Sequence, residues 1–407
     1  MRIPNWFKQC WQWLSRLFGI KSADGTAAPP LVEDQKTSPA APPPAEKPVR
    51  FWNFAPDGLV SFKNGPEKLP DPEIPEIAEK LHAALEHPEE IRFPFNLSGN
   101  NSPGVHFLTQ ADLPDHPVWF IGDVHGDYPA MTAVCEYIFG QDPESVICFC
   151  GDLIDRGQWS LETAAFAVKM ILEKNGRILW LKGNHEDGLK YRQEPAPAFF
   201  SKVKPAGFAD FLNEHPEYAS FGQDLLRFFA LLPTALFFPD GLLFTHGGVP
   251  MDDLFPKLTT PASFSDPAVL TDFSWIRIGP DTELKKVSRK MKGNTAGRVN
   301  IDEFFAKCAE LNIPAKRSIA GHIHPRGGYV RAFEKYAQED GPRYPRSRHL
   351  LSATILHDSV TPEFSSDGPQ PIAAALYCPN QNPDVKLLHF DENVLNYLYK
   401  FQSDKEI

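Results

Sequence analysis

The sequence has few cysteines, and they follow no pattern that could organise a fold. The six cysteines in 407 residues form no C-x-x-C pair and show no regular spacing, which argues against a disulfide-rich scaffold and against a thiolate metal site. Cys148 and Cys150 stand two apart in an apolar run, so both should face one buried side as small hydrophobic residues. We therefore expect a protein of a reducing compartment, the cytoplasm.

The sequence also lacks an uninterrupted apolar run of the roughly 20 residues that a membrane-spanning helix needs. The apolar stretch 228–244 is broken by Pro233, Pro239 and Gly241, which indicates buried core. No segment near the start has the apolar core of a signal peptide. We expect neither a membrane-spanning helix nor a cleaved leader.

Positive charge is scarce as well. Lys and Arg number 41 against 52 Asp and Glu, which gives a formal net charge of −11. An acidic surface repels polyanions, so we expect no nucleic-acid partner. A cleft that holds cations could still attract a phosphate group locally.

Apolar side chains recur at three- and four-residue steps near the N-terminus, which predicts an amphipathic helix over residues 1–21. The members of this stripe are Trp6, Phe7, Cys10, Trp11, Leu14, Leu17 and Phe18. Basic residues such as Arg2, Lys8 and Arg16 could meet anionic headgroups, so we expect peripheral contact with the inner membrane surface through residues 3–20. The alternative is a helix that packs on the protein's own body.

Composition divides the rest of the chain. Alanine and proline dominate the segment after the N-terminal helix, which predicts a disordered linker. A proline-rich lead-in with a helix at 75–86 should then pack on the edge of one large domain, whose insertion 199–232 should form a wall of its cleft. The expected divisions are 1–21 (helix), 22–48 (linker), 49–114 (lead-in), 115–395 (main domain) and 396–407 (C-terminal tail).

Polar phrases follow apolar runs at several places in the main domain. The phrases are Gly122–Gly126 (GDVHG), Gly151–Gly157 (GDLIDRG), Gly183–Glu186 (GNHE), His246 and Gly321–His324 (GHIH). The runs before the first four are Val118–Ile121, Val146–Cys150, Ile178–Leu181 and Leu242–Thr245, which we predict to be buried strands. Loops at the carboxyl ends of such strands converge on one crevice in open α/β sheets.

The residue types in these phrases suit metal binding. Carboxylates, an amide oxygen and imidazoles are the mixed donors that bind Mn, Fe or Zn. Turn chemistry is an equally good explanation of any one phrase, because Asp, Asn and Gly favour tight turns. It does not explain why His is interleaved with Asp at four strand ends, so the set as a whole predicts a two-metal site.

The order GDxHG, GDxxDRG, GNHE, HGG and a late His resembles the calcineurin-like metallophosphoesterases. The resemblance is narrower at Asp155-Arg156-Gly157 and at Glu186, which are typical of the phosphoprotein phosphatase branch, the serine/threonine phosphatases and their bacterial relatives. The resemblance covers roughly residues 115–395. It implies an α/β fold in which two packed mixed β-sheets are flanked by helices.

The resemblance also implies a ligand set for two divalent metal ions. Asp123 and His125 would bind the first ion, and Asp152 would bridge the two. The second ion would be held by Asn184, His246 and His322. We expect Mn, with Fe or Zn as alternatives, and a metal-bridging hydroxide that attacks the phosphorus directly.

Proton donation and phosphate binding follow from the same resemblance. His185 corresponds to the general acid, and Asp155 would orient its ring. Arg156, Arg298 and Asn184 would bind the phosphate oxygens. Arg277 and Arg289 lie near Arg298 in the sequence and are alternatives for its role.

Two features depart from the phosphatase pattern. His324 follows His322 in a GHxH arrangement typical of phosphodiesterases and exonucleases, where the second His joins the first metal. The alternative is a polar loop residue. The segment 352–357 also lacks the Tyr of the Ser-Ala-Pro-Asn-Tyr loop that the phosphatases carry beside the active site.

We therefore expect a phosphomonoesterase that acts on phosphoserine and phosphothreonine in proteins, with a small phosphoester as the other substrate class. A phosphodiesterase or dinucleoside polyphosphate hydrolase is the enzymatic alternative, because the metal motifs do not distinguish leaving groups. A non-catalytic binding protein on the same fold is a further alternative, which the intact ligand set argues against.

Overall fold

The computed structural model describes residues 59–62, 72–279, 295–324, 329–333, 349–352, 372–380 and 384–390. The chain divides into a larger compact unit, Lys68–His389, and a second unit formed by Met1–Glu67 and Phe390–Ile407. Strand β1 (Leu59–Phe62) belongs to the second unit. The predicted helix 1–21, linker 22–48 and tail 396–407 lie outside the described residues, and all the predicted domain boundaries remain predictions. No described helix is long and apolar enough to cross a membrane.

Two mixed sheets form the centre of the larger unit. The first runs in the order β16, β15, β3, β4, β5, with β3 to β5 parallel and β15 antiparallel to its neighbours. The second runs β13, β14, β12, β9, β8, β2 and also combines both kinds of pair. Their bounds are β2 (Gly104–Phe107), β3 (Val118–Ile121), β4 (Val146–Phe149), β5 (Ile178–Trp180), β8 (Pro233–Phe237), β9 (Leu242–Thr245), β12 (Arg317–Ala320), β13 (Tyr329–Ala332), β14 (His349–Ser352), β15 (Ile372–Leu376) and β16 (Asp384–Phe390).

Helices and two smaller strand pairs complete the unit. The pairs are β6 (Leu189–Arg192) with β7 (Ala198–Ser201), antiparallel, and β10 (Arg277–Ile278) with β11 (Thr295–Ala296), parallel. The helices are α2 (Ile74–Ala84), α3 (Tyr128–Gln141), α4 (Ser160–Glu173), α5 (Asn184–Gly188), α6 (Gly207–Glu214), α7 (Ala219–Phe229), α8 (Pro267–Trp275) and α9 (Arg298–Glu310). Short 3-10 turns cover Pro88–Glu90, Gly99–Asn101, Gln110–Asp112, Pro216–Tyr218, Asp252–Lys257 and Pro261–Ser265.

Both faces of the first sheet are buried, which explains the continuous apolar run of β3. Side chains alternate along a strand, so neighbours face opposite sides. Trp119 meets Tyr137 of α3, with ring centroids 6.3 Å apart. Phe120 points the other way and meets Phe244 of β9 at 4.7 Å. The two sheets therefore pack face to face through aromatic side chains.

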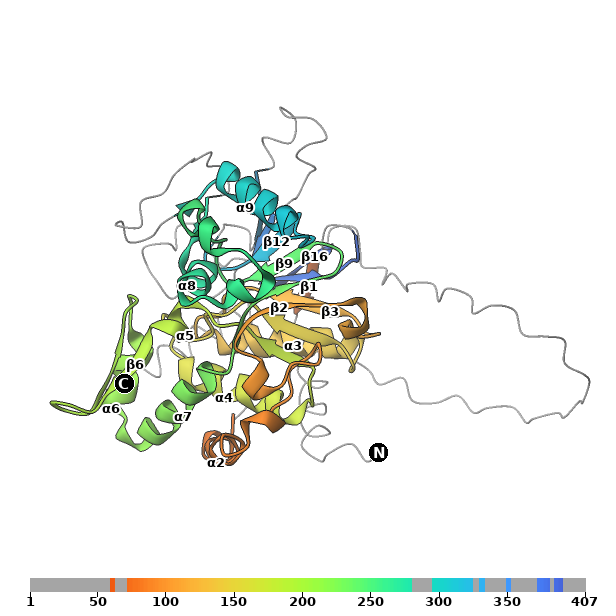
Figure 1. Cartoon of the computed structure of the whole chain (residues 1–407). Helices are drawn as coiled ribbons and strands as arrows, with labels where there is room; N and C mark the ends of the chain where they lie inside the picture. Colours follow the sequence, from red (N-terminus) through yellow and green to blue (C-terminus); the bar gives the residue numbers. More distant parts are fainter. Residues whose placement is uncertain are drawn as a thin grey trace, which may run out of the picture. The chain divides into compact units, whose positions relative to one another are not determined.

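Helices cover the outer faces of this pair of sheets. Phe273 of α8 and Phe304 of α9 pack together at 6.0 Å and share a buried cluster with Leu243 of β9. Figure 1 shows α8 and α9 on one side of the sheets and α3 and α4 on the other. This arrangement confirms the expected α/β fold of two mixed sheets flanked by helices.

The segment before β3 contributes elements of its own. Helix α2 matches the helix predicted at 75–86, and its Lys80 forms an ion pair of 2.9 Å with Glu173 of α4. Strand β2 pairs with β8 in the second sheet. The aromatic insertion 199–232 contains the end of β7 and the helices α6 and α7.

The predicted strands before the polar phrases are confirmed, with β3 and β9 matching residue for residue and β4 and β5 ending one residue early. The ends of β3 and β12, which belong to different sheets, come into direct contact. The backbone N–H of His322 donates to both carboxylate oxygens of Asp123, at 2.9 and 3.0 Å. A Cβ at Gly321 would lie 2.2 Å from Asp123 Oδ1. Only glycine fits between the two sheets at this point.

Gly321→Ala should therefore destabilise the fold. The added methyl group must displace the Asp123 carboxylate from the His322 amide, at a cost of about 1–3 kcal/mol in the free energy of unfolding. Gly140→Ala is the matched control. Gly140 lies in α3, and a Cβ at this position would meet nothing within 4 Å, so this variant should not be destabilised. Urea denaturation of both variants checks this. Equal midpoints for the two would contradict it.

Candidate metal centre

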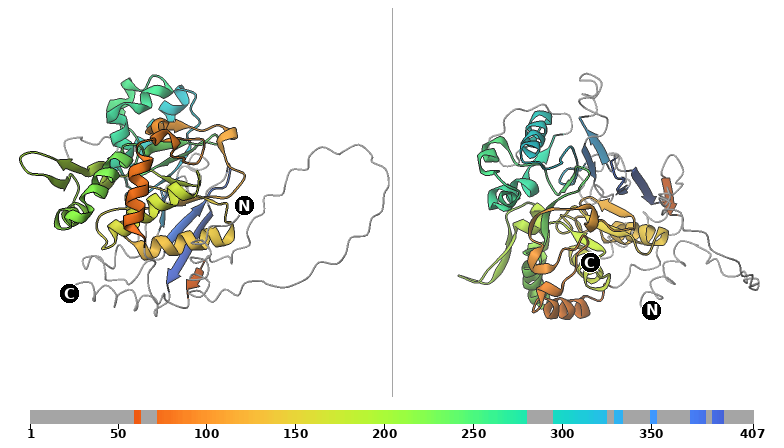
Figure 2. Two further views of the ribbon diagram at one scale, coloured as in Figure 1. Left: turned by 90° about the horizontal axis from the view of Figure 1, so that it is seen from below. Right: turned by 45° about the vertical axis from the view of Figure 1, so that its right-hand side comes forward.

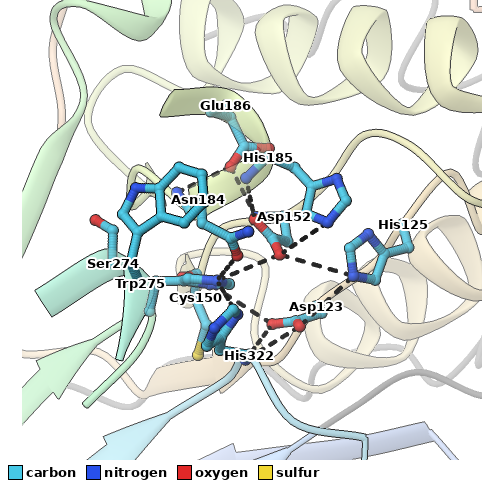
Figure 3. A network of polar contacts seen from close by, with 12 residues as sticks. Asp123, His125, Cys150, Asp152, Asn184, His185, Glu186, Ser274, Trp275 and His322 are labelled. Carbon is cyan, nitrogen blue, oxygen red and sulfur yellow. Dashed lines mark hydrogen bonds and ion pairs between the residues drawn. The ribbon is translucent and has the colours of Figure 1, made fainter. Parts of the chain in front are cut away.

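The polar residues of the five strand ends converge in one buried place. Figure 3 shows Asp152 at its centre, with His125 and His185 to one side and Asn184 to the other. The backbone turns sharply there, because His125, Asp152 and His322 have φ angles of 49°, 53° and 67°. Left-handed conformations are unfavourable for non-glycine residues and are held by surrounding contacts. The fold thus imposes the directions in which these side chains point.

Asp123 and Asp152 both approach His125 and form with it the first group of possible metal ligands, and Asp123 and His125 also lie close to His324. His125 Nε2 lies 3.7 Å from Asp123 Oδ2 and 3.7 Å from Asp152 Oδ2. His125 Nδ1 donates to the carbonyl oxygen of Ile154 at 3.0 Å, which leaves the lone pair on Nε2. Burial lowers the pKa of His125 well below its usual value, so the ring is neutral, as a metal ligand must be.

A second group surrounds His246 Nε2. This nitrogen lies 3.0 Å from Asn184 Oδ1, 3.2 Å from Asp152 Oδ2 and 3.2 Å from His322 Nδ1. Asp152 Oδ2 therefore faces both groups, while its Oδ1 accepts the backbone N–H of His185 at 2.9 Å. One carboxylate oxygen directed at two groups is the geometry that a bridging ligand requires.

The chemistry of the second group fits a cation. His246 Nδ1 lies 3.0 Å from the carbonyl oxygen of Cys150, which can only accept, so Nδ1 carries a hydrogen. On a neutral ring Nε2 would then direct a lone pair at the oxygens of Asn184 and Asp152. Burial favours that neutral ring, but the charges of Asp152 and Asp123 outweigh burial and raise the pKa of His246 to about 9. The site stabilises positive charge at Nε2, and a divalent ion can supply it in place of a proton.

The two carboxylates differ in their electrostatic environment. Burial raises the pKa of Asp123 to about 7, despite the positive charge of His246. Burial acts on Asp152 in the same direction, but the positive charges of His246 and His185 outweigh it and hold its pKa well below the usual value. Asp152 is thus an ionised carboxylate in the buried centre, which suits the bridging position.

His185 and Asp155 form a close pair beside this centre. His185 Nδ1 lies 2.6 Å from Asp155 Oδ2, and its Nε2 lies 3.9 Å from Asp152 Oδ2. The other oxygen of Asp155, Oδ1, accepts the backbone N–H of Phe208 at 2.9 Å. Phe208 lies in the first turn of α6, so the insertion after the GNHE phrase helps to fix this pair. The sequence contains no signal that could have indicated this amide.

Glu186 positions the backbone rather than a metal. Its buried carboxylate accepts the N–H groups of Asp152 and Leu153 at 2.8 and 2.9 Å, and that of Gly183 at 2.8 Å. These bonds tie the loop after β4 to the start of α5. Burial raises the pKa of Glu186 to about 8. Its place in the GNHE phrase was the only sequence signal for this role.

Arg156 and His324 contact each other at the rim of the first group. Arg156 Nη1 lies 3.1 Å from His324 Nε2, and because Arg can only donate, Nε2 must accept. The same nitrogen lies 3.6 Å from Asp123 Oδ2. The single lone pair of Nε2 cannot accept a hydrogen bond from Arg156 and bind a cation at the same time. His324 is therefore either the partner of Arg156 or a metal ligand through Nε2, but not both at once.

Arg277 and Arg298 are the two described candidates for the predicted second phosphate arginine. Arg277 lies close enough to Arg156 and His322 for its charge to lower the pKa of each, after burial as the main cause. Arg298, which sequence reasoning preferred, begins α9 directly after Gly297. Its predicted contact with phosphate remains a prediction. Arg289 and the segment 353–357 lie outside the described residues.

The comparisons with known proteins agree with this geometry. Residues 116–326, more than half of the chain, match the family model of the calcineurin-like phosphoesterases. The chain is 26% identical over 193 residues to the catalytic subunit of serine/threonine-protein phosphatase 6 of Caenorhabditis elegans, covering 46% of this chain and 54% of that protein. It is 25% identical over 265 residues to the PP2A-like serine/threonine-protein phosphatase PPG1 of Candida albicans, covering 62% and 59%.

A solved structure shares the fold. A serine/threonine phosphatase from Saccharomyces cerevisiae, described as similar to human phosphatase PP5, superposes with a TM-score of 0.52 at 16% identity, covering 77% of this chain and 90% of that one. The chain spans a little over half the length of the curated relatives it matches. The match to the family model, together with the site described above, shows that the chain belongs to the calcineurin-like phosphoesterase family.

Proposed function

We propose that the protein is a dinuclear metal-dependent phosphomonoesterase that acts on phosphoserine and phosphothreonine in proteins. One observation carries the proposal: the His185–Asp155 pair, 2.6 Å apart, lies beside a carboxylate that faces two groups of metal-ligand atoms. This combination supplies an acid for a leaving alkoxide next to a site for cations. The named activities of the two phosphatase relatives support the same substrate class.

Two divalent ions would be held by the residues already described. Asp123, His125 and Asp152 would bind one ion, and Asp152, Asn184, His246 and His322 the other, with Mn as the first expectation and Fe or Zn as alternatives. When bound, such ions polarise a phosphoryl group and lower the pKa of a water molecule. Their charge would also take the place of a proton on His246.

The protein's own groups would move the leaving-group proton. His185 donates its Nδ1 hydrogen to Asp155, which fixes the orientation of the ring. Nε2 then faces the centre and can donate to the departing alkoxide. Asn184, Arg156 and Arg298 would bind the phosphate oxygens, with Arg277 as the alternative to Arg298.

His324 supports a second candidate function. Its Nε2 lies 3.6 Å from Asp123, and its ring centroid lies 5.2 Å from that of His125. A fourth ligand at the first group is a feature of phosphodiesterases, so hydrolysis of a phosphodiester or a dinucleoside polyphosphate is the alternative. A non-catalytic role is less well supported, because the ligand atoms and the His185–Asp155 pair lie within contact of one another.

We also propose that the protein is cytoplasmic and contacts the inner membrane surface through residues 3–20. The aromatic stripe of that segment and its basic residues support this contact. The full-length chain should sediment with anionic vesicles at low salt, and a chain without residues 1–25 should not. Failure of the full-length chain to sediment would contradict the tether.

A substrate panel tests the proposed activity. With Mn added, the protein should hydrolyse a phosphoserine peptide with a higher kcat/KM than a phosphodiester or a dinucleoside polyphosphate.

Asp152→Asn should abolish turnover and weaken the binding of both metal ions, because the charge that they share is lost. Asp123→Asn should mainly weaken the binding of one ion. Metal analysis by mass spectrometry checks occupancy. Two ions at full occupancy and normal turnover in Asp152→Asn would refute the dinuclear assignment.

His185→Ala tests proton donation. The variant should lose about 10²–10⁴-fold in kcat on a serine phosphate, whose alkoxide needs a proton. Its kcat should fall much less on p-nitrophenyl phosphate, because the p-nitrophenolate leaving group is stable without a proton. Asp155→Asn should show the same trend more mildly. Equal losses on both substrates would remove His185 from the acid role.

A further inference from the structure

The hairpin formed by β6 and β7 is attached to the metal centre at both of its ends. Strand β6 begins at Leu189, directly after α5, which carries Asn184 and His185. After β7 the chain packs Val203 against Gly188 and reaches Phe208, whose backbone N–H binds Asp155. Figures 1 and 2 show the hairpin extending past α6 and α7. A molecule held on this hairpin would lie next to the site.

The two faces of the hairpin differ in character. The register pairs Tyr191 with Phe199 on the inner face, where the rings pack 4.8 Å apart and Phe199 is buried. Alternation places Lys190 and Phe200, which are paired across the strands, on the outer face, and there Phe200 is 42% exposed. Arg192 lies on the same outer face, and Lys202 continues it after β7.

This outer face is positively charged in an acidic protein. Residues 189–204 contain four basic residues and one acidic residue, whereas the whole chain has a net charge of −11. Arg192 and Lys202 are exposed, and neither forms an ion pair with another residue in the part of the chain that the structure describes. Lys190 reaches Asp187 only at 4.0 Å. The cations are therefore available to a partner.

We propose that the outer face of this hairpin, formed by Lys190, Arg192, Phe200 and Lys202, binds an acidic segment of a phosphoprotein substrate while its phosphoresidue lies in the metal centre. The inference rests on the proposed phosphatase function and adds a sequence preference to it. A net charge of −11 repels acidic proteins at long range, and a local basic face offsets this repulsion where the substrate must approach. The exposed ring of Phe200 gives the segment an apolar contact between the cations.

The length of the hairpin fixes where the acidic residues should stand. Arg192 is four residues beyond Gly188, the end of α5, and a strand rises about 3.3 Å per residue, so it lies roughly 13 Å further out. An extended peptide covers that distance in about four residues. Asp or Glu about three to six positions from the phosphoresidue should reach the cations.

The test compares phosphoserine peptides that carry Asp at those positions with peptides that carry Asn instead. The full-length protein should show a kcat/KM about fivefold to tenfold higher for the Asp peptides, as two or three exposed ion pairs can supply. The ratio of the two kcat/KM values should fall towards one at 1 M salt, where the Debye length is about 3 Å and the charges are screened. Arg192→Glu/Lys202→Glu should favour the Asn peptides, and Arg192→Gln/Lys202→Gln should show no preference.

Arg92→Glu is the matched control. Arg92 is an exposed cation whose Cβ lies near Gly176, at the amino end of β5 and so at the opposite edge of the sheet from the site. This variant should keep the wild-type preference. Loss of the preference in Arg92→Glu as well would show a general charge effect and overturn the inference.

The remaining outcomes separate the inference from the function on which it rests. If the wild-type protein hydrolyses the Asp and Asn peptides with equal kcat/KM, the inference is overturned and the phosphatase function still stands. Hydrolysis of p-nitrophenyl phosphate without hydrolysis of either peptide would overturn the proposed function itself. If the charge-reversed variant does not fold, the Gln variant and the salt titration decide the matter. Loss of binding to phosphatidylserine vesicles in the Gln variant, with an unchanged peptide preference, would assign the face to lipid and overturn the proposal.

Discussion

The buried carboxylate of Asp152 is the group on which the arrangement of the site depends. Its Oδ2 faces His125 and His246 from two directions, and its Oδ1 holds the backbone of His185. An ionised carboxylate in a buried place is costly unless positive charge and hydrogen bonds surround it. His246 and the carboxylate therefore stabilise one another, and a cation in each group would complete this balance.

The backbone around Asp152 is held by contacts that have no chemical role of their own. Glu186 accepts three backbone N–H groups and joins two loops, while Gly321 allows the ends of the two sheets to approach. Asp152 and His125 keep left-handed backbone conformations within this frame. Such positions are stable only where the surrounding structure fixes them. Packing of the two sheets thus determines the geometry of the ligands.

The insertion after α5 connects the site to the surface. Phe208 at the start of α6 binds Asp155, the partner of His185, and the hairpin before it presents cations beside the same site. One segment thus fixes the proposed proton donor and provides the surface proposed to select the substrate. Both roles depend on its rigid attachment at α5 and at Asp155. Chemistry and specificity would then share one structural support.

The sequence by itself determined the strands and the ligand types, because buried strands such as β3 and β9 are continuous apolar runs and the polar residues follow directly at their ends. Local patterns carry that information. The tertiary structure alone decided which distant groups meet: the Phe208 amide with Asp155, and Arg156 with His324. These contacts join residues that are far apart in the chain. They depend on how the two sheets and the insertion pack, so the sequence around a backbone amide or an arginine does not indicate its partner.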